Sequence, residues 1–102
     1  MLPLLEQHRD ALFRLCQTFA VKRLELFGSA SDGRFDPARS DLDFLVEFHP
    51  SPGLGVADQY FGLLEGLEDL FKRKIDLLQL PAVRNPYLLR GINSSRTLLY
   101  AA

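Results

Sequence analysis

The stretch that decides the fold reads Ser40-Asp41-Leu42-Asp43-Phe44-Leu45-Val46-Glu47-Phe48. Every second residue from Leu42 to Phe48 is apolar, as expected of a β-strand that buries one face. The opposite face of the same strand carries Asp41, Asp43 and Glu47 around Leu45. The sequence therefore predicts a strand over residues 41–48 that has one apolar and one acidic face.

Two shorter stretches, residues 23–27 and 74–78, show the same alternation of apolar and polar residues. If the three strands join into one sheet, one face is apolar throughout and the other is mostly polar. The second face then carries Glu25, Phe27, Asp41, Asp43, Leu45, Glu47, Asp76 and Leu78. We expect helices to cover the apolar face and to leave the other face partly open.

Apolar residues at intervals of three and four predict helices over residues 4–19 and 58–71. Asp58 is placed to cap the second helix. Residues 49–55, between the strand 41–48 and this helix, include two prolines and two glycines, which favour a loop. The pair Asn85-Pro86 is typical of an N-cap followed by proline, and it predicts a short helix that runs to Ile92.

The composition of the chain suits one globular domain, which we place over residues 1–102, because 47% of the side chains are hydrophobic and 25% are charged. The net charge of -1 gives no field that would attract nucleic acid or an anionic membrane. No apolar run approaches the ~18 residues of a membrane span. The lone Cys16 excludes an internal disulfide and fits a small core residue. These features predict a cytoplasmic protein that has neither nucleic acid nor a membrane as its partner.

The first strand ends in Leu26-Phe27-Gly28-Ser29. A glycine lets the backbone approach a phosphate closely, and the adjacent hydroxyl and N–H groups are donors that a phosphate accepts. A Gly-Ser pair alone also occurs in ordinary turns. It gains meaning only from the acidic residues that follow it.

Asp41 and Asp43 are separated by one residue, so on a strand their side chains leave the same face about 7 Å apart. Two such anions repel each other, and their presence in an apolar strand favours a divalent cation that offsets their charge. Asp76, flanked by apolar residues on another strand, is a third carboxylate on that face. A structural reading stays open for each aspartate, as a turn cap at Asp41 or as an ion pair of Asp76 with Arg23 or Lys74.

These residues resemble a known signature in their order and spacing. Leu26-Phe27-Gly28-Ser29, then Asp41-Leu42-Asp43 after eleven residues, then Asp76, are similar to the motif of the DNA polymerase β-like nucleotidyltransferase superfamily. The closer resemblance is to the minimal nucleotidyltransferases of bacteria and archaea, of the antitoxin type, whose neighbours are often HEPN-domain toxins. The resemblance extends from Leu24 to Tyr100. It implies a mixed α/β fold of order α-β-turn-β-α-β-α, with a small mixed sheet and helices on one face.

The resemblance also implies a reaction and a role for each residue of the motif. Gly28 and Ser29 would hold the triphosphate of a nucleotide, and Asp41 and Asp43 would ligate one or two Mg²⁺ ions. Asp76 would share a metal ion and help to activate the attacking hydroxyl. The implied reaction transfers AMP from ATP to a hydroxyl group. In relatives paired with a HEPN toxin, that hydroxyl belongs to a tyrosine of the toxin, so a HEPN-domain protein is the expected partner and the chain its antitoxin.

One departure from the family pattern keeps alternative functions open. Many relatives have arginines directly after the Gly-Ser pair, whereas this chain has Ala30-Ser31-Asp32-Gly33. An aspartate that faces a triphosphate weakens its binding through like-charge repulsion. A non-catalytic antitoxin or a nucleotide-sensing module would neutralise its partner by complex formation alone, and a divalent-metal module would bind no nucleotide. The three carboxylates are intact, which favours the enzyme.

Overall fold

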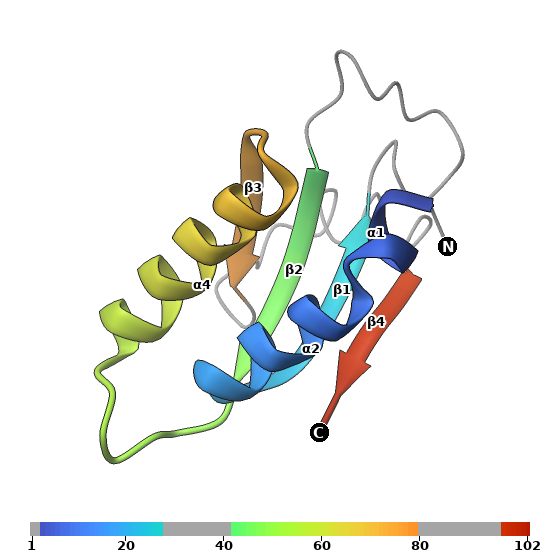
Figure 1. The fold of residues 1–102 in the computed structure, drawn as a ribbon. Coiled ribbons are helices and arrows are strands. Elements are labelled where there is room, and N and C mark those ends of the chain that lie inside the picture. Colours follow the sequence, from blue (N-terminus) through green and yellow to red (C-terminus); the bar gives the residue numbers. More distant parts are fainter. Residues whose placement is uncertain (1–2, 28–41, 80–96) are drawn as a thin grey trace, which may run out of the picture.

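The computed structural model describes residues 3–27, 42–79 and 97–102, which form a sheet and a layer of helices (Figure 1). The helices are α1 (Pro3–Gln7), α2 (Arg9–Thr18) and α4 (Val56–Phe71). The strands are β1 (Val21–Phe27), β2 (Leu42–Phe48), β3 (Ile75–Gln79) and β4 (Thr97–Ala101). The predicted mixed α/β fold is confirmed. None of the helices in these residues is long and apolar enough to cross a bilayer.

The sheet has four strands in the order β3-β2-β1-β4. Strand β1 pairs antiparallel with both β2 and β4, whereas β2 pairs parallel with β3. A parallel pair cannot be joined by a tight turn, and here α4 supplies the longer connection from β2 to β3. The sheet is therefore mixed, as the resemblance implied.

The helices lie together on one face of the sheet (Figure 1). Leu24, Phe44 and Leu77, from three different strands, are buried beneath this layer at 5% exposure or less. Cys16 of α2 is also fully buried, so its predicted place in the core is confirmed. Burial raises the pKa of the Cys16 thiol to about 12, because a thiolate would lose its hydration there.

The N-terminal helix differs from its prediction. Instead of one helix over residues 4–19, the chain forms two helices that meet at His8. The backbone of His8 leaves the helical region, with φ -109 and ψ 15, and its ring packs edge-on against Phe71, 5.5 Å between centroids. This contact joins residues far apart in the sequence, so helical periodicity could not reveal it.

The start of α4 also differs from its prediction. The N-cap position is occupied by Gly55, so Asp58 lies within the first turn of the helix rather than before it. A carboxylate in the first turn still interacts favourably with the positive end of the helix dipole.

The chain ends in a strand that the expected order of elements does not contain. Strand β4 pairs with β1, and the register shifts between Leu24 and Glu25. Its apolar stretch Leu98-Leu99-Tyr100 is too short to show a period, which is why the sequence alone did not identify it. The short helix expected from Asn85 to Ile92 lies outside the described residues.

The second face of the sheet is only partly open. Asp76 is exposed, whereas Glu25 and Leu45 on the same face are 3% and 1% exposed. The expectation of a partly open polar face is therefore correct at β3 and wrong at the middle of β1 and β2.

Two glycines of α4 allow it to approach α2 closely. A Cβ atom built on Gly62 would overlap the ring of Phe19, and one built on Gly66 would overlap the side chain of Leu15. Any larger residue would require these side chains to move. The close approach brings α4 down onto the same core as α2.

A buried glutamine fixes the start of α4 to the sheet. Gln59 is 3% exposed, and its Nε2 donates hydrogen bonds to the backbone oxygens of Phe19 at 3.1 Å and His49 at 2.9 Å. In addition, the His49 N–H donates to the oxygen of Ala20 at 2.8 Å. One amide side chain therefore joins the end of α2, the end of β2 and α4.

Replacing Gln59 by leucine tests this junction. We expect Gln59→Leu to lower the free energy of unfolding by about 1–3 kcal/mol, because two backbone carbonyls lose their donor while the volume changes little. Urea denaturation measures the loss. The control Gln17→Leu changes an exposed glutamine of α2 and should stay within about 0.5 kcal/mol of the parent. Equal losses in the two variants would contradict the assignment.

Candidate active site

The parallel pairing of β2 with β3 places two of the predicted acidic residues directly opposite each other. Asp43 and Asp76 are register partners. Neighbouring strands lie about 4.8 Å apart, so the two side chains leave the same face of the sheet side by side. Asp43 is partly buried and Asp76 is exposed. Two acidic residues from adjacent strands thus lie side by side on one face of the sheet.

The register that brings these acids together is set by the core on the other face. The flanking pairs are Leu42 with Ile75 and Phe44 with Leu77, and all four side chains are at most 5% exposed. If β3 slipped by one residue, Asp76 would point into the core, and Ile75 and Leu77 would point to the opposite face. The hydrophobic packing therefore determines where the carboxylates lie.

The end of β1 lies beside the same row. Phe27, its last residue, is the antiparallel partner of Asp43. The row Phe27–Asp43–Asp76 thus crosses three strands, and Gly28 and Ser29 follow Phe27 directly in the sequence. Phe27 was placed on this face by the alternation but was not singled out as a site residue. Its position as the partner of Asp43 became visible only from the register.

Three of the predicted site residues, Gly28, Ser29 and Asp41, lie outside the described residues. Asp41 directly precedes Leu42, the first residue of β2. Within the described residues, no group of three His, Cys, Asp or Glu side chains could hold a metal ion. The two carboxylates that are described, Asp43 and Asp76, have the oxygen donors that Mg²⁺ prefers.

The ion pairs that the sequence left open for Asp76 are not found. Among residues 3–27, 42–79 and 97–102, the ion pairs are Lys22 with Glu47 at 3.6 Å and Arg23 with Glu25 at 2.6 Å. Neither involves Asp76, and Arg23 bonds another carboxylate. Within the described residues, ion pairing with Arg23 or Lys74 therefore does not account for Asp76.

Glu25 is an acidic residue whose environment the sequence did not reveal. It lies on β1 opposite Leu45, on the same face as Asp43, and it is 3% exposed. Its Oε1 accepts a hydrogen bond from Nε of Arg23 at 2.6 Å. The alternation with Leu24 and Leu26 places Glu25 on the polar face, and its burial depends on what packs over that face, which the local pattern does not show.

Comparison with known proteins gives one family for the chain. Residues 6–99 match the model of the nucleotidyltransferase domain. A relative from Methanocaldococcus jannaschii, the putative protein adenylyltransferase MJ0128, is 33% identical over 89 residues, which cover 87% of this chain and 84% of that protein.

Two solved structures share the fold. A structure described as a putative minimal nucleotidyltransferase is 27% identical to this chain and has a TM-score of 0.71. The match covers 91% of this chain and 90% of that chain. The second match is a chain from the complex of tri-AMPylated Shewanella oneidensis HEPN toxin with MNT antitoxin, with 17% identity and a TM-score of 0.63. This match covers 95% of this chain and 72% of that chain.

Because Asp43 and Asp76 are register partners, we expect Asp76→Asn to affect stability differently with and without a divalent cation. In EDTA, Asp76→Asn should raise the free energy of unfolding by roughly 0.2–1 kcal/mol, because like charges on opposed residues destabilise a sheet. In millimolar Mg²⁺, the parent should gain thermal stability and the variant should gain less. Thermal denaturation monitored by circular dichroism measures both effects.

Glu47→Gln is the matched control, because Glu47 lies on the same strand as Asp43 but is the register partner of Arg23. It removes an exposed ion pair with Lys22, so it should not raise stability in EDTA. Its response to Mg²⁺ should equal that of the parent. An Mg²⁺ response that Asp76→Asn leaves intact would exclude Asp76 as a ligand.

Proposed function

The chain belongs to the nucleotidyltransferase domain family, and on this premise we propose that it transfers AMP from ATP to a hydroxyl group of a partner protein. The observation that carries the proposal is the register pairing of Asp43 with Asp76 beside the end of β1. The sequence adds Asp41 before β2 and Gly28-Ser29 after β1. In the sequence, the acidic residues thus lie at the starts of β2 and β3, and the Gly-Ser pair follows the end of β1, which pairs with the start of β2.

In the proposed reaction, Asp41, Asp43 and Asp76 hold one or two Mg²⁺ ions, and Gly28 and Ser29 bind the triphosphate through N–H and O–H donors. Mg²⁺ held by these carboxylates would supply positive charge that stabilises the negative charge of the phosphate oxygens during the displacement. The acceptor oxygen forms a bond to the α-phosphorus, the bond to pyrophosphate breaks, and the proton of the hydroxyl passes to the Asp76 carboxylate and from there to water. The exposed carboxylate of Asp76 can orient this hydroxyl. Positioning and charge neutralisation provide the catalysis.

We propose a HEPN-domain protein as the partner and one of its tyrosines as the acceptor. Support comes from the matching solved complex, in which a HEPN toxin is AMPylated and bound to an MNT antitoxin. Support also comes from the relative named as a protein adenylyltransferase. Modification of the toxin would make this chain an antitoxin.

The reaction is tested by incubating the chain with Mg²⁺, ATP labelled at the α-phosphate and the HEPN-domain protein from the same genome. We expect covalent label on that protein. Asp43→Asn and Asp76→Asn should each slow labelling roughly 100-fold or more, because charge stabilisation at the phosphate is lost. Glu47→Gln should label at the parental rate, and mass spectrometry should place the AMP on a tyrosine.

The same experiment also tests the alternative function, a non-catalytic antitoxin. The sequence Ala30-Ser31-Asp32-Gly33, which lacks the arginines of many relatives, is the observation that favours a non-catalytic antitoxin. In that case the chain would neutralise the HEPN protein without labelling it. Asp43→Asn would then leave neutralisation unchanged, and the proposed transfer would be wrong.

A further inference from the structure

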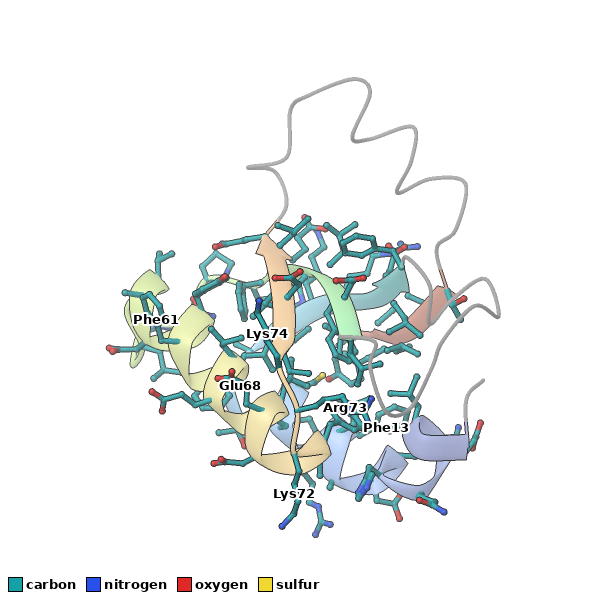
Figure 2. The ribbon with its side chains drawn as sticks, turned by 90° about the horizontal axis from the view of Figure 1, so that it is seen from above. Phe13, Phe61, Glu68, Lys72, Arg73 and Lys74 are labelled. Carbon is teal, nitrogen blue, oxygen red and sulfur yellow. The ribbon has the colours of Figure 1, made fainter. Side chains whose placement is uncertain are left out.

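The outer surface of α4 exposes a large aromatic side chain. Phe61 is 58% exposed, although most large apolar residues of this helix are buried or partly buried. Figure 2 shows Phe61 near one end of α4 and Lys72 just beyond the other. Aromatic side chains, phenylalanine among them, are enriched in protein–protein interfaces relative to the rest of the surface.

Phe61 packs against a tyrosine that is itself hydrogen-bonded to the sheet. Its ring packs edge-on against Tyr60, with centroids 5.1 Å apart. The Tyr60 hydroxyl donates a hydrogen bond to the backbone oxygen of Leu77 at 2.7 Å. Leu77 follows Asp76 on β3, so the exposed ring is linked through one side chain to the strand that carries the candidate active site.

The charges around Phe61 all have one sign. The charged residues of α4 are Asp58, Glu65, Glu68 and Asp69, and the helix has no lysine or arginine. Asp58 and Glu65 are three and four residues from Phe61, and such spacings place side chains on one helix face. None of these four carboxylates takes part in an ion pair with another described residue. The exposed face of α4 thus carries an aromatic residue with unpaired negative charges around it, and the basic residues Lys72, Arg73 and Lys74 follow only at the opposite end of the helix from Phe61 (Figure 2).

A shallow hollow lies beside this face, between α2 and α4. Its volume is about 280 Å³, and it is lined by Ala11, Leu15, Gly66, Asp69 and Leu70. The small residues Ala11 and Gly66 leave the space, and Asp69 is the one charged residue of the lining. The volume is at the lower limit of the roughly 300–1,000 Å³ of small-molecule pockets. It suits an apolar side chain from another protein.

We propose that this surface, the α4 face (Phe61, Glu65, Glu68, Asp69 and the adjoining hollow), binds a basic segment of the partner protein. An apolar side chain of that segment would enter the hollow, and its lysines or arginines would pair with the carboxylates. The inference deepens the proposed function and rests on it for the identity of the partner. Helix α4 is joined to β3 by the hydrogen bond from Tyr60 to Leu77, but Asp76 lies on the opposite face of that strand. A partner bound here would have to extend around the β3 side of the described sheet to reach the candidate site.

A second copy of the chain fits this surface poorly. In a two-fold dimer the same patch faces itself. Four acidic residues without a basic residue between Val56 and Phe71 would then meet four more. Such like-charge contacts oppose association. A second copy offers basic residues only at the end of the helix, at Lys72, Arg73 and Lys74. The acidic stretch around Phe61 therefore suits a basic partner better than the same stretch of a second copy.

The test measures binding without catalysis, by titrating the purified HEPN-domain protein from the same genome into the chain in the absence of ATP. We expect Phe61→Ala and Glu65→Lys each to weaken binding about tenfold or more, through loss of an anchor and through charge reversal. Both residues are exposed, so the melting temperature should stay near that of the parent. Raising the NaCl concentration should weaken parental binding more than that of Glu65→Gln.

Control variants separate this inference from the proposed function. Glu6→Lys reverses an exposed charge on α1 and should bind like the parent. Asp43→Asn should bind but not label, which isolates catalysis from docking. If Phe61→Ala and Glu65→Lys both bind with the affinity of the parent, the proposal that the α4 face is the docking surface is wrong, while the proposed transfer reaction is unaffected.

If the parent chain neither binds nor labels the HEPN-domain protein, the proposed partner itself is wrong. A concentration-dependent dimer in sedimentation that Glu65→Lys abolishes would assign the face to a second copy and also overturn the inference.

Discussion

The site depends on the register between β2 and β3, which is maintained by side chains that never touch it. Leu42 and Phe44 pack opposite Ile75 and Leu77 on the helix-covered face. Because side chains alternate between faces, this packing fixes Asp43 against Asp76 on the other face. Burial of these apolar side chains stabilises the register that sets the two aspartates opposite each other. A nucleotidyltransferase can thus place like charges together because the core, rather than the charges, sets their positions.

Helix α4 connects the core, the candidate site and the proposed docking surface. Its inner face contributes Leu63 and Leu67 to the core, and Gln59 fixes its start to the ends of α2 and β2. Tyr60 joins it to β3 by a hydrogen bond to Leu77. The outer face carries the aromatic and acidic residues. One helix therefore supplies the crossover that the parallel β2–β3 pair requires and presents the proposed docking surface on its side away from the sheet.

Much of the fold could be predicted because it follows from local patterns. Alternation identified β1, β2 and β3 within a few residues, and the face that would be buried, because one buried face imposes a period of two. The break at His8 and strand β4 were not predicted. The first accompanies a ring contact with Phe71, and the second has too few residues to show a period. Both depend on partners distant in the sequence.

The sequence by itself determined the order and spacing of the residues that we predict to carry the chemistry: a Gly-Ser pair, two aspartates one residue apart and a third aspartate between apolar neighbours. It determined this because order and spacing along the chain are local properties, and they match the motif that the chain resembles. Only the tertiary structure decided that Asp43 faces Asp76, that Phe27 completes their row and that Glu25 is buried. Pairing between strands and coverage of a face arise from contacts between distant segments, and no local period of one chain encodes them.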